Sequence, residues 1–372
     1  MICRKIILPV LILSFSTSVA FCQTEVLKGV VNSLAFYKQK KDLKYLANAK
    51  KTVDSLVTTR ADSMDMEKTV YRIVVNSSIL YLDSLNKLNQ PPNFFLQTTD
   101  LVDNLSSRRK AYKYQAEIDY SKRCLANVYL RKAFAYMNKS DFNNALQLFQ
   151  SAQKYAPSFK QINTYIAYSN SKLGNMQTAA KYYADLVNSD STKAEYVQAA
   201  SNNYKLLGDT LSALNILKKG RKLLPNDKTL LLDEANIYSN RKDYRSLAPL
   251  LPALLDINSN NADIAFVAAI CYDHLNQYDK AESLYLRSIE LNSSSYDPIF
   301  NLGILYLKES VKKKERGVNP DNTRAAQWLE KANEISPNNM ACLQALQLVY
   351  TQSGNQDQIN RINNKLKQLT NQ

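Results

Sequence analysis

The stretch DFNNALQLFQSAQKYAPS, residues Asp141 to Ser158, decides the fold. Its apolar residues recur at intervals of three and four, which predicts an amphipathic helix. Ala145 and Ala152 lie on the apolar side, where small side chains let a second helix cross at close range. Pro157 cannot continue a helix and therefore ends it. The rest of the fold depends on whether this pattern returns along the chain.

The pattern does return, at intervals of 34 residues. Ala145 is followed by Ala179, Ala213 and, after Leu247, by Ala281. A tyrosine series skips one copy and has the same period: Tyr136, Tyr204, Tyr238, Tyr272 and Tyr306. Small residues are expected at helix crossings, tyrosines in the adjoining holes, and glycines such as Gly174 and Gly208 in the tight turns. A single hairpin cannot bury both of its faces, so the copies must stack.

With this period and these residue types the chain resembles the tetratricopeptide repeat family, whose repeats have 34 residues. The segment Asn301-Leu302-Gly303, followed by Tyr306, is the copy most similar to the family's first helix. The resemblance implies an all-α fold, a right-handed superhelix of stacked helix-turn-helix repeats. About seven repeats are expected in residues 126–372. In the sixth, Ala325 comes ten residues late, which places an insertion at residues 308–324.

The region before the repeats, residues 23–125, is less regular. Helical periodicity is visible in residues 41–57, 66–88 and 99–120, and residues 89–95 are predicted to form a loop. We expect a helical N-terminal region of degenerate repeat hairpins that caps the array.

Residues 1–22 have the pattern of a signal peptide. Arg4 and Lys5 precede an apolar run that is too short to span a bilayer. Cleavage after Cys22 would leave Gln23 first and would lower the net charge from +15 to +13. The alternative is a lipoprotein acylated on Cys22, but Phe21 is not the small residue that such sites prefer. We therefore expect an exported protein, periplasmic or associated with the outer membrane.

A further resemblance concerns the source of the chain. An exported repeat array with an insertion in a first helix, rich in Lys, Asn and Tyr, is similar to envelope tetratricopeptide repeat proteins of Bacteroidota. Triplets of the type Asp-Ser/Thr-apolar, which are glycosylated in that group, begin here at Asp54, Asp62, Asp83 and Asp209.

Catalysis is not expected. His274 is the only histidine, which argues against catalytic triads, and we interpret it as a surface residue near the end of a helix. The seven glycines are too far apart for a phosphate-binding loop. Cys124, Cys271 and Cys342 lack metal-ligand spacing and are expected to pack between helices. No cofactor, metal or catalytic residue is predicted.

The resemblance instead implies a partner protein or peptide in a concave groove lined by the first helices. Asn202 and Asn236 occupy the same position in successive copies, where amides could hold a peptide backbone. Placing the copies in register gives the predicted groove residues Arg131, Phe134, Tyr165, Tyr168, Gln198, Asn202, Asn236 and Phe266.

The positive charge supports a second hypothesis, in which basic faces bind an anionic envelope surface or polymer. Export argues against nucleic acid as the partner, and no transmembrane span is expected after signal removal. The strongest basic cluster lies in the insertion, where added segments on a rigid scaffold often carry function. It comprises Lys312, Lys313, Lys314 and Arg316.

Overall fold

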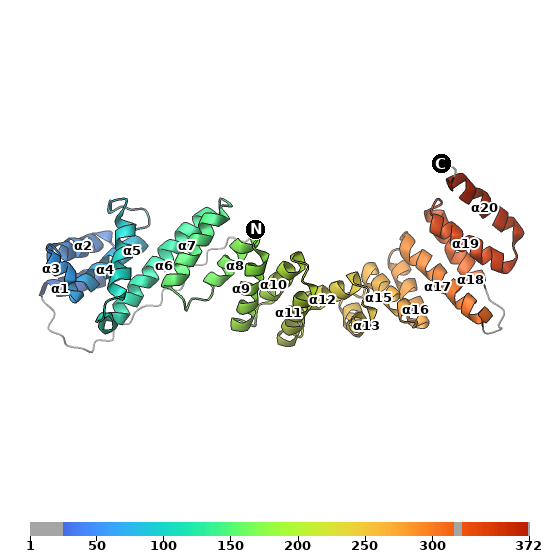
Figure 1. Cartoon of the computed structure of the whole chain (residues 1–372), viewed down its shortest axis with the longest axis horizontal. Coiled ribbons are helices and arrows are strands. Elements are labelled where there is room, and N and C mark those ends of the chain that lie inside the picture. Colours follow the sequence, from blue (N-terminus) through green and yellow to red (C-terminus); the bar gives the residue numbers. More distant parts are fainter. Residues whose placement is uncertain (1–24, 316–321, 371–372) are drawn as a thin grey trace. The chain divides into compact units, whose positions relative to one another are not determined.

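The computed structural model describes residues 25–315 and 322–370, and all the regular elements in these ranges are helices. The prediction of an all-α fold of stacked helix-turn-helix repeats is confirmed (Figure 1). The predicted signal peptide, residues 1–22, and Arg316 lie outside the described residues. The chain divides into two compact units after Leu173.

Unit 1 ends at Leu173 and contains helices from both the irregular region and the first repeats. They are α1 (Glu25–Lys40), α2 (Leu43–Leu56), α3 (Arg60–Met64), α4 (Met66–Leu82), α5 (Phe94–Ser106), the 3₁₀ helix η1 (Ala111–Tyr114), α6 (Gln115–Met137), α7 (Phe142–Tyr155) and α8 (Ile162–Lys172).

Unit 2 begins at Gly174 and consists of further hairpins. Its helices are α9 (Met176–Ser189), α10 (Ala194–Leu206), α11 (Thr210–Leu223), α12 (Lys228–Asn240), α13 (Tyr244–Leu247), η2 (Ala248–Leu250), α14 (Leu251–Ile257), α15 (Ala262–His274), α16 (Tyr278–Leu291), α17 (Tyr296–Glu315), α18 (Thr323–Ile335), α19 (Met340–Ser353) and α20 (Gln356–Thr370).

Two predicted helices of the N-terminal region are shorter than expected. The helix predicted over 66–88 ends at Leu82, because the Asp83 carboxylate accepts hydrogen bonds from the backbone amides of Lys87 and Leu88 and closes a turn. The helix predicted over 99–120 is interrupted between Ser106 and Gln115 by a turn and η1. The loop predicted over 89–95 ends where α5 begins, at Phe94.

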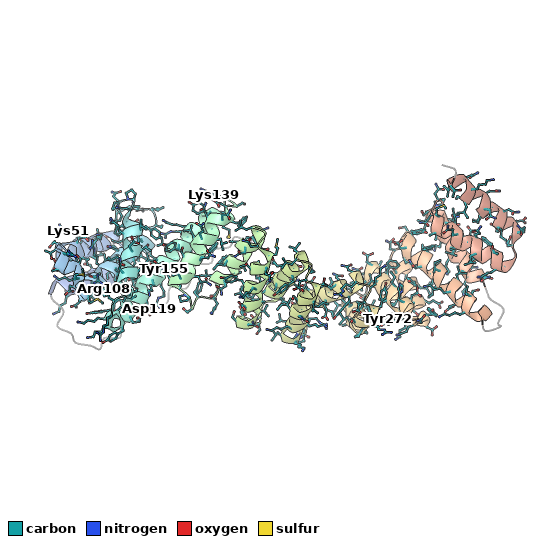
Figure 2. The ribbon with its side chains drawn as sticks, in the orientation of Figure 1. Lys51, Arg108, Asp119, Lys139, Tyr155 and Tyr272 are labelled. Carbon is teal, nitrogen blue, oxygen red and sulfur yellow. The ribbon has the colours of Figure 1, made fainter. Side chains whose placement is uncertain are left out.

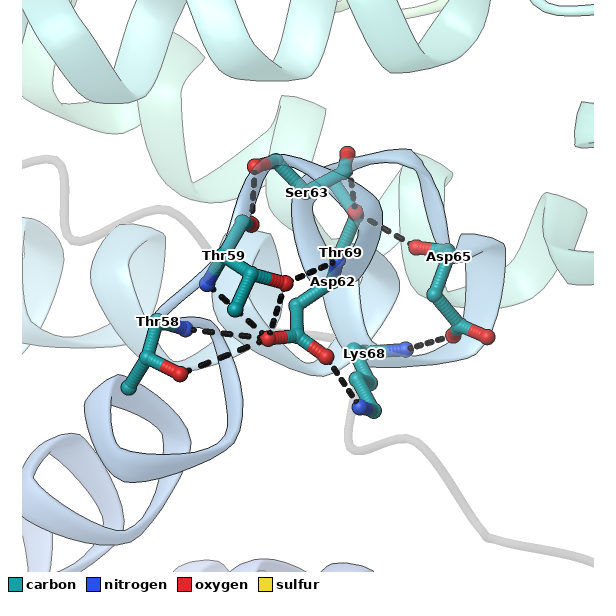
Figure 3. Close-up of polar contacts among 7 residues, drawn as sticks. All are labelled: Thr58, Thr59, Asp62, Ser63, Asp65, Lys68 and Thr69. Atoms are coloured by element: carbon teal, nitrogen blue, oxygen red, sulfur yellow. Dashed lines mark hydrogen bonds and ion pairs between the residues drawn. The ribbon is translucent and has the colours of Figure 1, made fainter.

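The connection between α2 and α4 is fixed by polar contacts around Asp62 (Figure 3). Its carboxylate accepts hydrogen bonds from the Thr59 hydroxyl at 2.7 Å and from Lys68 Nζ at 2.6 Å. The Lys68 ammonium and the Thr59 hydroxyl hold the pKa of the Asp62 carboxyl well below its usual range. The Thr59 side chain in turn caps Asp62 N–H, so α3 begins with a capping box. The polar cluster around Asp62 therefore holds α3 and the start of α4 in place.

The turn between the two helices of a hairpin uses one backbone position again and again. A residue with positive φ occurs there at 34-residue intervals, at Ser140, Gly174, Gly208, Lys242 and Asn276. Such a left-handed residue ends the first helix. The residue that follows stands at the N-cap position of the second helix. In three hairpins it is an aspartate that accepts a backbone N–H: Asp141, Asp209 and Asp243.

The sixth hairpin lacks this turn. Ser310, 34 residues after Asn276, is buried and helical, so α17 continues through the turn position as far as Glu315. Its hydroxyl donates to Asn322 Oδ1, just before α18. The last hairpin returns to the usual turn with Gly354, at φ 71°. The predicted insertion therefore lengthens a first helix by further turns.

The small residues lie at helix crossings as predicted. Ala145, Ala179, Ala213 and Ala281 are fully buried. A Cβ on Gly303 of α17 would lie 2.7 Å from Leu329 Cγ of α18, so only glycine fits that crossing. Tyrosines fill the neighbouring holes at Tyr238, Tyr272 and Tyr306, whereas Tyr136 is exposed. Figure 2 labels Tyr272 on α15 and the buried Tyr155 on α7.

The second helix of the fourth hairpin is broken into three short pieces, α13, η2 and α14. Pro249 and Pro252 cannot donate the backbone hydrogen bonds that a continuous helix needs. Leu247 and Leu251 still point into the core. The apolar repeat position is therefore kept by Leu247, although the helix is divided.

Replacing Gly303 by alanine is expected to destabilise the protein by about 1–3 kcal/mol, because the new methyl group overlaps Leu329. Chemical denaturation followed by circular dichroism measures the change. Gly29→Ala is the matched control, since Gly29 lies in α1 with open space around its Cα. That control should be neutral or stabilising by up to about 1 kcal/mol. Equal effects of the two substitutions would contradict the close crossing.

Candidate functional site

The candidate site in unit 2 is the face formed by the first helices of its hairpins, hereafter the first-helix face. Four predicted residues lie on these helices: Gln198 and Asn202 on α10, Asn236 on α12, and Phe266 on α15. Gln198 Nε2 donates a 3.1 Å hydrogen bond to Asp233 Oδ2 of α12, so two first helices are joined directly. The face thus has side-chain contacts that fix the spacing of neighbouring repeats.

Asn202 and Asn236 are both exposed on this face. They stand one repeat apart, at corresponding positions of α10 and α12. Each amide carries two donor hydrogens and an acceptor oxygen that solvent or a ligand can reach. Phe266 is less accessible, because its ring packs 6.1 Å from the Tyr285 ring of α16. The two asparagines are therefore the best-placed polar groups among the four.

In unit 1 the predicted residues serve mainly to pack the helices. Arg131 donates hydrogen bonds to the carbonyl oxygens of Leu80, at 2.9 Å, and Tyr81, at 3.1 Å. It therefore satisfies carbonyls at the end of α4 that the helix itself leaves unpaired. This role is not visible in the repeat pattern, because those carbonyls lie outside the repeating part of the chain.

Phe134 and Tyr165 belong to an aromatic cluster between α6, α7 and α8. Phe134 meets Tyr165 edge-on with ring centroids 4.7 Å apart, and both rings pack against the fully buried Phe149. Tyr168 is the more accessible aromatic residue of α8, at 40% exposure. Its ring contacts Phe142 edge-on, and Lys172 Nζ lies 5.4 Å from its centroid. Tyr168 alone of these three presents a large surface to solvent.

His274 lies at the end of α15 and is exposed, in agreement with its interpretation as a surface residue. Its ring stacks on Tyr244 with a centroid distance of 4.3 Å and an interplanar angle of 7°. The neighbouring Asp273 is buried and accepts two hydrogen bonds from Lys308 of α17, at 2.8 and 3.0 Å. The ion pair between Asp273 and Lys308 thus joins α15 to α17, which are both first helices of unit 2.

The basic insertion is described only in part. Lys312, Lys313 and Lys314 all belong to α17, but of the three only the Lys312 side chain is described. Lys312 Nζ donates to the Tyr278 hydroxyl at 2.5 Å and lies 4.4 Å from the centroid of that ring. The lengthened helix thus reaches back to the preceding hairpin.

An open pocket of about 490 Å³, which no sequence motif predicts, lies beside this contact. Ile304 and Leu348 stand at the register position of Asn202 and Asn236 in later hairpins, the second after the ten-residue shift. The pocket is therefore continuous in register with the first-helix face. It is lined by Asn276, Tyr278, Ile304, Leu307, Lys308, Val311, Lys312 and Leu348.

Burial raises the pKa values of several cysteine and tyrosine side chains. Burial raises the pKa of the Cys271 and Cys342 thiols to about 11, and that of the Cys124 thiol to about 12. Burial, and then a hydrogen bond to Glu282, raises the pKa of Tyr306 to about 12. Thiols and phenols held neutral in this way are poor nucleophiles and bases near neutral pH.

Residues 25–315 and 322–370 contain no group of three or more His, Cys, Asp or Glu side chains arranged to hold a metal ion. Within those same ranges, no helix combines the length and apolar character needed to cross a bilayer.

Two segments of the chain match a repeat family, and solved structures with low sequence identity are similar to part of the chain. Residues 126–159 and 262–295 match the family model of the tetratricopeptide repeat. The first segment covers the C-terminal half of α6 together with α7, and the second covers α15 and α16. The solved structure of MamA is similar over 46% of this chain and 94% of its own, with 20% identity and a TM-score of 0.40.

Two other solved structures are similar. YrrB, a TPR protein with an unusual peptide-binding site, has 20% identity over 53% of this chain and 96% of its own, with a TM-score of 0.43. A tetratricopeptide repeat protein from Parabacteroides merdae ATCC 43184 has 16% identity over 60% of this chain and 98% of its own, with a TM-score of 0.39.

Arg131→Ala is expected to lower the stability of the protein by about 1–2 kcal/mol, because carbonyls at the end of α4 lose their partner. Denaturant unfolding measures the loss, and Lys139→Ala, at an exposed turn residue, is the matched control. An unchanged unfolding midpoint in the Arg131 variant would show that these hydrogen bonds do not hold α4 and would restore Arg131 as a ligand candidate.

Proposed function

We propose that this chain, whose helical hairpins are tetratricopeptide repeats, is a protein-interaction scaffold that binds an extended partner segment along the first-helix face of unit 2. The observation that carries the proposal is the exposure of Asn202 and Asn236 at corresponding positions of adjacent first helices. Amides repeated in this way can pair with successive peptide groups of a partner backbone.

The surroundings of the two asparagines favour recognition over catalysis. The hydrogen bond between Gln198 and Asp233 fixes α10 against α12, so the asparagines are held at a set spacing before a partner arrives. Such preorganisation lowers the entropic cost of binding. Unit 2 therefore presents polar side chains at a fixed spacing. We propose that its function is to display this surface to a partner, with no chemical step.

We further propose that the protein is exported, on the basis of the basic, apolar and small-residue pattern of residues 1–22. N-terminal sequencing of the mature protein should find Gln23 as the first residue. A blocked, lipid-modified Cys22 would instead support outer-membrane attachment, and an intact Met1 in the mature protein would contradict export.

A second candidate function is binding to an anionic envelope component through basic faces. The net charge of +15 favours it, and several lysines, including Lys218, Lys219 and Lys222, are exposed on α11. Attraction of this kind is screened by salt, whereas amide and apolar contacts are much less sensitive. Salt dependence therefore separates the two candidates.

The double variant Asn202→Ala/Asn236→Ala should weaken binding of peptides selected from a random library by the unmodified chain. The expected loss is about 10- to 100-fold, because two or more hydrogen bonds disappear. Fluorescence anisotropy measures the affinity at low and at physiological salt. Asn215→Ala, an exposed asparagine on α11, is the control and should bind normally. Peptides that bind both variants equally, or that dissociate with moderate salt alone, would contradict the proposed role of this face.

A further inference from the structure

We propose that the pocket between α17 and α19 takes a bulky apolar side chain of an acidic partner segment; this rests on the proposed function, because the pocket continues the first-helix face. The partner class is thus a peptide segment in which Asp or Glu residues flank a residue such as Leu, Ile or Phe. The argument rests on the shape of α17, on the pocket lining and on its charge.

The pocket exists because α17 does not stop where the other first helices do. Asn276 turns the chain with φ 56° before α16, but its counterpart Ser310 is helical. Val311 and Lys312 therefore extend α17 at the register positions where the preceding hairpin has Gln277 and Tyr278. This added helix forms a wall opposite the Asn276–Tyr278 turn, and the space between them is the pocket.

The inside of the pocket is mainly aliphatic. Ile304, Leu307 and Val311 come from one side of α17, and Leu348 comes from α19. Leu348 is 47% exposed, so an apolar surface remains open to solvent at the side of the pocket. A volume of about 490 Å³ is ample for one large apolar side chain and part of its backbone. Burial of such a side chain is the main source of affinity that the pocket can offer.

The charge of the pocket selects the flanking residues of the partner. Two lysines and no carboxylate line it. Lys308 is neutralised by the buried Asp273. Lys312 contacts only neutral groups among the described side chains: the Tyr278 hydroxyl and ring, and Asn276 Oδ1 at 3.5 Å. Its positive charge is thus held at the rim without an acidic partner in the described part of the chain.

Those neutral contacts also fix where the charge lies. The Tyr278 hydroxyl accepts from Lys312 and donates to Asn276 Oδ1 at 2.8 Å, so the ammonium is positioned before binding. A carboxylate beside the pocket would gain a charge-assisted hydrogen bond with little loss of side-chain freedom. Lys313 and Lys314 follow in the sequence and add positive charge to the same helix. Acidic segments are therefore favoured over neutral or basic ones.

The test is selection of random peptides by the full chain, followed by affinity measurements on the selected peptides. The variants are Lys312→Glu and Leu348→Glu. Their matched controls are Lys331→Glu on α18 and Leu286→Glu on α16, which are also exposed. Circular dichroism confirms folding of each variant, and Lys312→Gln replaces the charge reversal if that variant melts early.

The expected result is a set of peptides in which Asp or Glu flanks a bulky apolar residue. Their binding should weaken by about tenfold or more with Lys312→Glu and with Leu348→Glu, and should be unchanged in the controls. Exchanging the acidic residues of the peptide for lysine should restore binding to Lys312→Glu.

Selected peptides without acidic residues, or with unchanged affinity for both pocket variants, would overturn the pocket. If those peptides still lose affinity for Asn202→Ala/Asn236→Ala, the proposed function stands and only the pocket fails. Failure to select any peptide overturns both. Loss of binding to phosphatidylglycerol vesicles in Lys312→Glu, with peptide binding intact, would also overturn the pocket and assign the basic end of α17 to a lipid surface.

Discussion

The left-handed residue at the hairpin turn is the constraint on which the arrangement of the repeats depends. Because it recurs every 34 residues, each first helix ends at the same depth and each second helix begins with its cap in register. The buried Ala145, Ala179, Ala213 and Ala281 then lie at corresponding helix crossings. Where the constraint is relaxed, at Ser310, the helix continues and the surface changes with it. The regular hairpins and the lengthened α17 thus follow from the presence or absence of the same turn residue.

Much of the repeat architecture could be predicted from the sequence, because residues that recur at a fixed interval occupy equivalent packing positions. The alanine and tyrosine series placed the crossings and most of the filled holes, and Gly174 and Gly208 placed two of the turns. Ser140, Lys242 and Asn276 occupy the same backbone position. Asparagine is common in this conformation, but serine and lysine are not, so only the register could have located Ser140 and Lys242. The breaks at Pro249 and Pro252 occur in one hairpin only, so the repeat pattern does not predict them.

The site was less predictable, for a related reason. Register alone cannot tell a residue that faces solvent from one that packs against a neighbouring hairpin. Phe134 and Tyr165 pack, and Arg131 caps a helix outside the register, whereas Asn202 and Asn236 remain exposed. The pocket depends on Leu348 coming beside an extended α17, which requires knowing how the insertion is folded. Of its lining residues, Lys312 belongs to the predicted basic cluster, but the aliphatic residues carry no motif.

The proline-broken hairpin has a consequence for the mechanics of unit 2. In a linear stack each hairpin is stabilised mainly by its neighbours, so the interfaces act in series and the weakest sets where the stack separates. The three short pieces α13, η2 and α14 cannot share the cooperative hydrogen bonding of one continuous helix. Under tension we therefore expect the fourth hairpin to separate before the other hairpins of unit 2.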